Sequence, residues 1–258
     1  MAENDNINIL GKKIFFLHPS TIVQNQVIME LAQEEFEVYT VKEEKKLNKV
    51  LKKYPDSIVF ASINEGMREK AWEEWITGIM SSAETSGVSI SIIASGVNDA
   101  TKRKYLLQFK NLCGYTVMKS DINEVIKQII KILTGIDAKG RRKFIRAVTD
   151  SELNTTVNFP VNGTFMNGKI KDISAIGFSC SFEEDPGLVK NSLFSDIQIR
   201  LQSHLFKAEG IVFGSRMNAG EKVYVVLFTQ RINPEVRTKI RKFIQNNLQN
   251  KMDLELDS

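Results

Sequence analysis

The hydrophobic periodicity of the chain changes near residue 140, and this change constrains the fold more than any other feature. Before it, short apolar runs alternate with segments whose apolar residues recur every three or four positions, as in buried strands followed by amphipathic helices. After it, apolar and polar residues alternate, as in half-buried antiparallel strands. A chain of 258 residues is long enough for two domains of ordinary size. We therefore predict an α/β domain followed by a β domain.

The first half carries five short apolar runs, each followed by a segment with helical spacing. The runs predict strands of a parallel sheet, which is covered on both faces and so lacks strict polar alternation. They span residues 14–17, 36–41, 58–61, 89–94 and 115–118. The expected helices are one that Ser20 and Thr21 can cap, followed by 43–53, 66–85, 99–110 and 121–134. This order predicts a doubly wound five-stranded parallel sheet over residues 11–134, after a disordered tail at residues 1–10.

The second half predicts a small antiparallel barrel. Its alternating runs are punctuated by Asn-Gly and Ala-Gly pairs, which favour turns. The runs span residues 153–159, 164–173, 176–182, 195–202, 205–213 and 222–229. Asn233-Pro234-Glu235 supplies a cap, a proline at the first helical position and an acid in the first turn, so a helix starts there. We assign residues 147–250 to a six-stranded antiparallel barrel with a C-terminal helix, and residues 251–258 to a tail.

A basic segment separates the two halves. Residues 139–146 read Lys-Gly-Arg-Arg-Lys-Phe-Ile-Arg, with five cationic side chains and no acid. Residues 1–140 hold equal numbers of basic and acidic side chains, so the formal net charge of +4 arises from residues 141–258. Residues 135–146 form the expected linker, with Gly140 as a hinge. The charge excess is too small to predict general nucleic-acid binding, in which broad basic patches dominate affinity.

Two short motifs carry the most specific signal. Arg142-x-x-x-Arg146 lies in the linker, and Asp172-x-Ser174-x-x-Gly177 follows an alternating run. In this order, at the junction of linker and barrel, they resemble the two-part signature of PilZ domains over residues 139–250. PilZ domains bind cyclic di-GMP, and the resemblance implies that ligand here. The ligand-binding residues that it implies are Arg142, Arg146, Asp172, Ser174 and Gly177, with Arg141 as an auxiliary contact.

The chemistry of these residue types suits a ligand made of phosphodiesters and guanines. Guanidinium groups bind phosphate oxygens and the O6/N7 edge of guanine through paired hydrogen bonds, and they stack on purines. Asp172 can accept hydrogen bonds from guanine N–H groups, and Ser174 can donate to a phosphate or guanine acceptor. Gly177 lets a base lie close to the backbone. The competing interpretation is structural: a solvated basic linker, then a turn at residues 172–174 with a bulge at Gly177.

The first half resembles a bacterial receiver domain in layout, but it lacks the residues of receiver chemistry. Where a receiver has its acidic pair, this chain has His18 and Pro19, and where it has the phosphoacceptor aspartate, this chain has Ala61. The position of the hydroxyl residue falls on Ala94 or Ser95. Lys119, followed by Ser120, stands where a receiver has its lysine. Without the carboxylates there is no Mg²⁺ site, and no acyl-phosphate can form. The resemblance therefore implies a scaffold for homodimerisation or partner docking rather than a phosphorylation switch.

Composition and motif content argue against several classes of protein. Cys113 and Cys180 lie far apart, without a C-x-x-C pair or a nearby histidine, so we expect no disulfide or metal and a reducing compartment. No apolar run approaches 18 residues and the N-terminus is polar, so we expect a cytoplasmic protein without a membrane span. No nucleophile–base pair or phosphate-binding glycine loop is apparent, so we expect neither an enzyme nor a cofactor.

The resemblance to PilZ domains therefore implies a non-catalytic bacterial receptor for cyclic di-GMP. Binding at the junction of linker and barrel would rearrange the two domains and control an unidentified downstream protein. The family resemblance implies a role in motility or surface behaviour. The alternative is a nucleic-acid-binding regulator that uses the barrel and the basic linker, because small barrels bind single strands. The small charge excess and the scattered phenylalanines count against nucleic acid as the partner.

Overall fold

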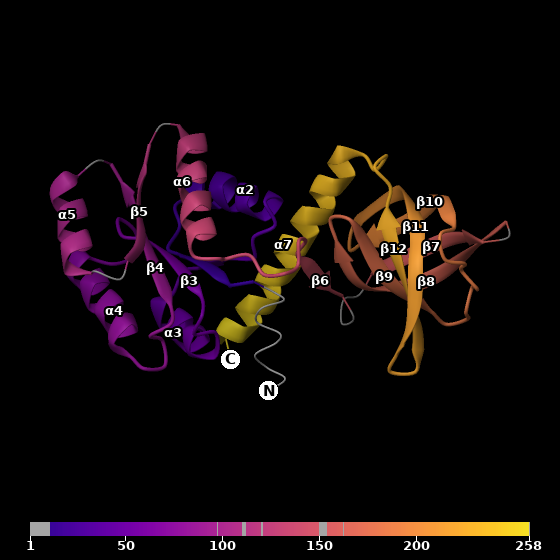
Figure 1. Cartoon of the computed structure of the whole chain (residues 1–258), viewed down its shortest axis with the longest axis horizontal. Coiled ribbons are helices and arrows are strands. Elements are labelled where there is room, and N and C mark those ends of the chain that lie inside the picture. Colours follow the sequence, from indigo (N-terminus) through magenta and orange to yellow (C-terminus); the bar gives the residue numbers. More distant parts are fainter. Residues whose placement is uncertain are drawn as a thin grey trace. The chain divides into compact units, whose positions relative to one another are not determined.

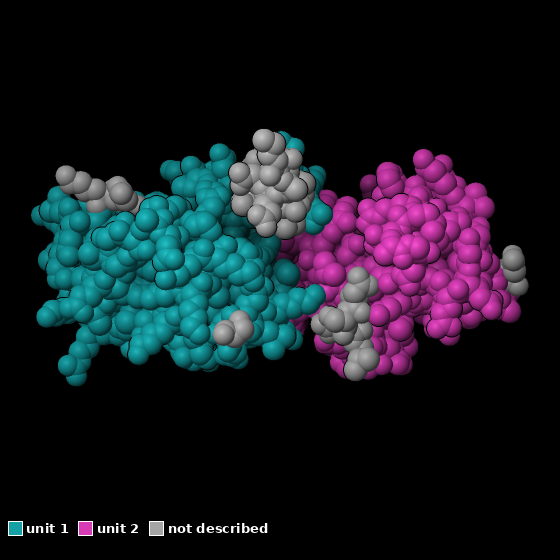
Figure 2. Space-filling model, turned by 90° about the horizontal axis from the view of Figure 1, so that it is seen from below, with its two compact units in different colours: residues 1–143, 248–258 teal, residues 144–247 magenta. Residues whose placement is uncertain are grey.

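The computed structural model describes residues 11–96, 98–109, 112–119, 121–149, 154–161 and 163–257. The chain divides into two compact units, and Figure 2 gives each its own colour. Unit 1 comprises residues 1–143 together with 248–258, and unit 2 comprises residues 144–247. The tail expected at residues 1–10 lies outside the described residues.

Unit 1 is built on a parallel sheet, and this part of the predicted fold is confirmed. In the described part of the chain the strand order is β2-β1-β3-β4-β5, one of the common doubly wound orders (Figure 1). Register pairs such as Phe15 with Val59 show that neighbouring strands run in the same direction. The strands are β1 (Ile14–Leu17), β2 (Val38–Val41), β3 (Ile58–Ser62), β4 (Ser89–Ser95) and β5 (Leu112–Met118).

Helices cover both faces of this sheet, because successive side chains of a strand point to opposite faces. Phe15 and Leu17 of β1 belong to one buried cluster, and Ile14 and Phe16 belong to the other. The first cluster includes residues of α3 (Glu44–Lys53), α4 (Glu69–Ser81) and α5 (Asp99–Gln108). The second includes residues of the π-helical segment η1 (Val23–Val27), α2 (Ile28–Gln33) and α6 (Ile122–Gly135). Both faces are therefore buried, as the apolar strands require.

Unit 2 is a closed antiparallel barrel with a C-terminal helix, which also confirms the prediction. Within the described residues, β8 pairs with β7 on one side and β9 on the other, so the ladder β8-β7-β10-β11-β12-β9 returns to β8 (Figure 1). Its core holds Val157, Phe159, Ile170 and Ile199, all fully buried. The strands are β7 (Thr155–Val161), β8 (Thr164–Ser174), β9 (Gly177–Phe182), β10 (Leu193–Leu201), β11 (His204–Asn218) and β12 (Glu221–Phe228).

A further short strand, β6 (Arg146–Val148), lies beside the barrel on the end of β8. The sequence analysis placed Arg146 in a linker, but its backbone is part of the sheet. The first half of that expected linker is also structured. Ala138 is buried, and its carbonyl accepts a hydrogen bond of 2.9 Å from the backbone N–H of Lys12 in unit 1. Residues 135–140 therefore belong to unit 1, and the change of unit falls between Lys143 and Phe144.

Helix α7 (Pro234–Asp257) differs most from expectation. It starts as predicted, and Asn233 Oδ1 accepts a hydrogen bond of 2.8 Å from the Glu235 N–H. The helix then runs through residues 251–257, which the sequence analysis assigned to a tail, so that assignment was wrong. Its physical reason is burial: Met252 and Leu256, four positions apart, lie in the core of unit 1. Among the described residues, no helix is long and apolar enough to cross a membrane.

Candidate functional site

The second motif forms a tight hairpin in unit 2. Strand β8 ends at Ser174 and β9 begins at Gly177, so only two residues connect the strands. Ser174 lies directly opposite Gly177, and its hydroxyl donates a hydrogen bond of 3.1 Å to the Gly177 carbonyl. The same register places Asp172 opposite Ser179. The motif residues are therefore fixed by strand pairing rather than carried on a mobile loop.

The first motif reaches this hairpin through β6. Arg146 pairs with Ser174, and Val148 pairs with Asp172, on the edge of β8 opposite to β9. Residues opposite one another on neighbouring strands share a face of the sheet. The end of β8 is thus flanked by Arg146 on one side and by Gly177 on the other.

One ion pair connects the two motifs. Arg146 Nη1 lies 3.2 Å from Asp172 Oδ1, and the hydroxyl of Ser179 donates a hydrogen bond to Asp172 Oδ2. The Asp172 side chain is mostly buried, whereas that of Arg146 is 44% exposed. A guanidinium carries five N–H donors. Arg146 can therefore hold Asp172 and still offer donors to an anion that approaches from solvent.

Ser179 was not among the predicted site residues. Ser179 is buried and lies outside both motifs, yet its hydroxyl donates a hydrogen bond to one carboxylate oxygen of Asp172. A signal for it was present in the sequence. Once Ser174 and Gly177 close a two-residue hairpin, antiparallel pairing places residue 179 opposite residue 172.

Gly177 has a structural reason to be glycine. A Cβ at this position would lie 2.2 Å from the carbonyl oxygen of Val226 and 3.0 Å from Cα of Leu227, both on β12. Gly177 pairs with Leu227, so the close approach belongs to the closing ladder of the barrel. The expectation was that this glycine makes room for a base. The structure shows another reason for glycine: β9 and β12 approach too closely at this position to leave room for a Cβ.

The remaining predicted site residues, Arg141 and Arg142, belong to unit 1. Of the six predicted positions, the structure therefore brings together Arg146, Asp172, Ser174 and Gly177 in unit 2. Arg141 lines a hollow of about 360 Å³ in unit 1. The other residues that line this hollow are Gly11, Lys12, Asp56, Asp137, Lys139 and Gly140.

His18 lies at the carboxyl edge of the unit 1 sheet, where doubly wound proteins bind ligands. His18 follows β1 with a φ of 51°, and its ring meets Trp72 edge-on at 5.7 Å between centroids. Gly66 packs so closely on the ring that a Cβ there would lie 2.4 Å from His18 Cγ. Lys119 pairs with Glu124 at 3.6 Å, and Ser120 lies outside the described residues. In the described part of the chain, no three potential metal ligands cluster.

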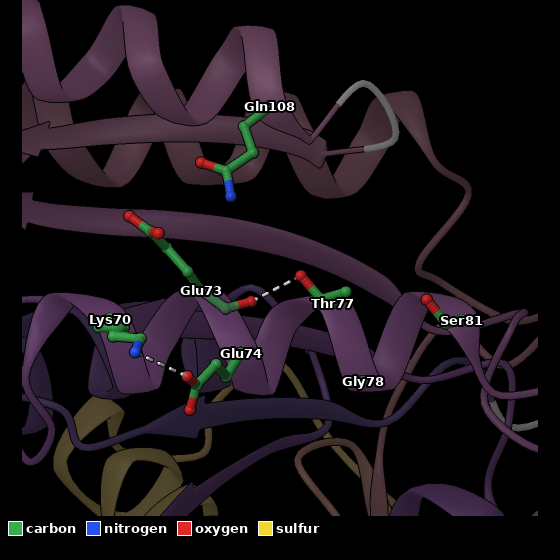
Figure 3. A pocket seen from close by; sticks show the side chains of 7 residues that line it. All are labelled: Lys70, Glu73, Glu74, Thr77, Gly78, Ser81 and Gln108. Atoms are coloured by element: carbon green, nitrogen blue, oxygen red, sulfur yellow. Dashed lines mark hydrogen bonds and ion pairs between the residues drawn. The ribbon is translucent and has the colours of Figure 1, made fainter.

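A second hollow in unit 1 lies on α4 and the end of α5 (Figure 3). It measures about 440 Å³, and none of the residues that line it belongs to either motif. Its charged residues are paired, Glu74 with Lys70 at 3.8 Å and Glu73 with Lys104 at 2.5 Å. The lining residues are Lys70, Glu73, Glu74, Thr77, Gly78, Ser81 and Gln108. This arrangement offers no nucleophile with a base beside it.

The two cysteines are free thiols and not poised for reaction. Burial raises the pKa of Cys113 to about 11, and burial also raises the pKa of the Cys180 thiol well above its ordinary value. Both stay protonated at neutral pH, and the thiolate is the reactive form.

Comparisons with known proteins find similarity in solved structures alone. No protein-family model and no curated protein sequence matches this chain. The PilZ domain of YcgR from Escherichia coli, solved with c-di-GMP, is 14% identical, with a TM-score of 0.38 over 46% of this chain and 98% of that domain. MrkH of K. pneumonia, solved as a c-di-GMP complex, is 16% identical, with a TM-score of 0.39 over 47% of this chain and 57% of MrkH.

The PlzA protein of Borreliella burgdorferi, solved in complex with c-di-GMP, is 21% identical, with a TM-score of 0.30. The match covers 45% of this chain and 52% of PlzA. The chain thus spans about half the length of these larger relatives.

Proposed function

We propose that the chain is a non-catalytic receptor for cyclic di-GMP whose site lies where β6, β8 and β9 meet. The contact between Arg146 and Asp172 supports this proposal most. The arginine of one short motif and the aspartate of the other lie together on adjacent strands, beside Ser174 and Ser179. A cation held by an acid, next to hydroxyls and open to solvent, suits an anionic ligand that also carries N–H donors.

Each residue has a role in the proposed complex. Arg146 binds a phosphate or the O6/N7 edge of guanine through paired hydrogen bonds. Asp172 accepts from guanine N–H groups. Ser174, whose hydroxyl donates to the Gly177 carbonyl in this structure, exchanges that partner for an acceptor of the ligand. Arg142 precedes Arg146 by four residues, so the chain between them spans at most about 14 Å. Arg142 and Arg141 can therefore close on a ligand that Arg146 holds.

We further propose that ligand binding repositions the segment between Gly140 and Arg146 and thereby rearranges the two units. Gly140 follows Ala138, which is anchored in unit 1, and Arg146 is anchored in β6 of unit 2. A ligand shifts such an equilibrium only by as much as it prefers one arrangement. The proposed output is control of a partner protein in motility or surface behaviour.

Calorimetric titration of the full chain with cyclic di-GMP tests the receptor function, with GTP and cyclic AMP as control ligands. We expect saturable binding, which also gives the stoichiometry. Arg146→Ala and Arg142→Ala should each weaken binding by roughly 2–5 kcal/mol, at least about 30-fold. Arg216→Ala is the matched control, because Arg216 is an exposed arginine of the same barrel, on β11. Equal affinity in the wild type and both motif variants would refute the assignment.

Small-angle scattering tests the rearrangement separately. The scattering profile of the full chain should change on addition of cyclic di-GMP, and it should stay unchanged for Arg146→Ala. A profile that stays the same although calorimetry shows saturation would reject the rearrangement while leaving the receptor function in place. A steep salt dependence of binding to single-stranded DNA, without cyclic di-GMP binding, would favour a nucleic-acid regulator instead.

A further inference from the structure

Helix α7 contributes to both units of the chain. Its residues up to Asn247 belong to unit 2, and its residues from Leu248 belong to unit 1. Met252 and Leu256 lie in the same buried cluster of unit 1 as Val41 and Leu51, and Leu248 packs against that cluster. The last turns of α7 are therefore part of the unit 1 core, although the barrel separates them in sequence from the rest of that unit.

These turns cover the open edge of the unit 1 sheet. Within the described residues, β2 pairs with β1 alone, so its other edge has no strand beside it. At Thr40 of β2, the side chain of Gln249 takes the place of a neighbouring strand. Its Oε1 accepts a hydrogen bond of 2.8 Å from the Thr40 N–H, and its Nε2 donates one of 3.0 Å to the Thr40 carbonyl. A side-chain amide has the same donor and acceptor as a peptide group, so Gln249 does locally what a neighbouring strand would do.

Ion pairs between α3 and the end of α7 add to the contact between residues 248–257 and unit 1. Lys46 of α3 lies 2.9 Å from Asp257, and Lys53 lies 2.6 Å from Glu255. The hydroxyl of Tyr54 donates to the same Glu255 at 2.9 Å. Both lysines are substantially exposed, and exposed pairs contribute little in water. Three apolar side chains, the Gln249 amide and a few partly exposed polar pairs hold the segment, and it makes fewer close contacts than the central strands do.

We propose that residues 248–257 act as a detachable clip: they leave the β2 edge as one cooperative unit while the sheet of unit 1 stays folded. Segments with few buried contacts open at lower free energy than the core around them. When the segment leaves, the N–H and carbonyl groups of Thr40 lose their Gln249 partners and become exposed to solvent. The helix that carries the clip begins in unit 2 and ends in unit 1.

Native-state hydrogen exchange on the full chain, followed by NMR, tests the clip. We expect the Thr40 amide and the amides of residues 249–256 to exchange through one shared opening, about 100-fold less protected than the amides of β1. Gln249→Ala should lower the protection of Thr40 about tenfold and leave β1 unchanged. Asn250→Ala is the control, because Asn250 is an exposed amide on the next position of the same helix.

Exchange of Thr40 and β1 at one common rate in the wild type would overturn the proposal, since the segment would then be a fixed part of the fold. Unchanged Thr40 protection in Gln249→Ala would overturn it as well. A cross-link supplies the converse measurement. Lys46→Cys with Asp257→Cys, in a Cys113→Ser background and joined by a short bismaleimide, should raise Thr40 protection toward that of β1. No rise in the cross-linked chain would count equally against the clip.

Discussion

Arg146 Nη1 lies 3.2 Å from Asp172 Oδ1, which joins two residues that are 26 positions apart. The pair stands at the edge of a barrel, with the arginine 44% exposed and the aspartate 19% exposed. Because the arginine is substantially exposed, we expect the pair to contribute little to folding. In the proposed function it orients the Arg146 guanidinium toward the ligand.

A double-mutant cycle separates stability from binding. Arg146→Ala, Asp172→Ala and the combined variant should show a coupling of about 0.2–1 kcal/mol in the free energy of unfolding. The loss of cyclic di-GMP affinity in Arg146→Ala should exceed that coupling several-fold. Chemical denaturation and calorimetry measure the two quantities. A coupling above about 2 kcal/mol in unfolding would instead make the pair a structural element.

Ser179→Ala tests whether Ser179 positions Asp172. Its hydroxyl donates to Asp172 Oδ2 from the directly opposite position on β9. Loss of one hydrogen bond to a charged group costs about 1.5–3 kcal/mol, so affinity for cyclic di-GMP should fall about tenfold or more. Ser179→Thr keeps the hydroxyl and should restore most of the affinity. Equal weakening by alanine and threonine would point to packing rather than positioning.

Gly177→Ala should destabilise the barrel. The new Cβ would meet the Val226 carbonyl oxygen at 2.2 Å, which forces β9 and β12 apart. Overpacking of this kind costs about 1–3 kcal/mol, and thermal unfolding followed by circular dichroism measures it. Gly214→Ala is the control, because a Cβ at Gly214 would meet nothing within 4 Å. Similar melting temperatures for the two variants would show that the β9–β12 contact relaxes easily.

Gly66→Ala should destabilise unit 1 for two separable reasons. Gly66 has a φ of +70°, and a Cβ there would collide with the His18 ring. The strained backbone costs about 1–2 kcal/mol by itself, and the collision adds to it. In a His18→Ala background the collision disappears and only the backbone cost remains. Denaturant unfolding of both single variants and the double variant checks this, and strict additivity would contradict the contact.

The stability of the α7 contact should depend on pH through Glu255. Burial acts to raise the pKa of the Glu255 carboxyl, but hydrogen bonds from Lys53 and Tyr54 outweigh it, so the pKa lies below its ordinary 4.5. A lowered pKa in the folded state means a stabilising contribution that is present above pH 4.5 and lost as the pH falls below it.

Glu255→Gln should therefore lower the melting temperature slightly at pH 7, and the difference from the wild type should shrink as the pH falls below 4.5. The effect is small because the carboxylate is one-third exposed. Thermal melts of both proteins across this range measure it. A difference that persists at acid pH would mean that the glutamine disturbs packing rather than charge.

The parts of the fold that repeat a pattern could be predicted from the sequence. Five apolar runs separated by helical spacing leave few choices besides a parallel sheet, and six alternating runs with turn signals leave few besides a barrel. The hairpin at Asp172–Ser179 was also within reach, since the spacing of Ser174 and Gly177 fixes its register. These features follow from patterns among residues that are close together in the sequence.

Other features depend on contacts that local sequence does not encode. Strand β6 has three residues, too few to show any period. The last turns of α7 alternate Met252, Leu254 and Leu256 with polar or charged residues, so the burial of Met252 and Leu256 became visible only with the core that receives them. The packing role of Gly177 was not foreseen, because the approach of Val226, 49 residues later in the chain, leaves no trace in the local sequence.

The return of α7 to unit 1 sets an order of events during synthesis. The sheet of unit 1 is encoded before the barrel, but the residues that cover β2 leave the ribosome after the whole barrel has been made. Domains generally fold as they emerge, from the N-terminal end. The nascent sheet must therefore wait with a bare edge while residues 144–247 are translated, and a bare edge strand is a template for unwanted pairing. The lysines along α3, next to that edge, are suited to keep other chains away during this interval.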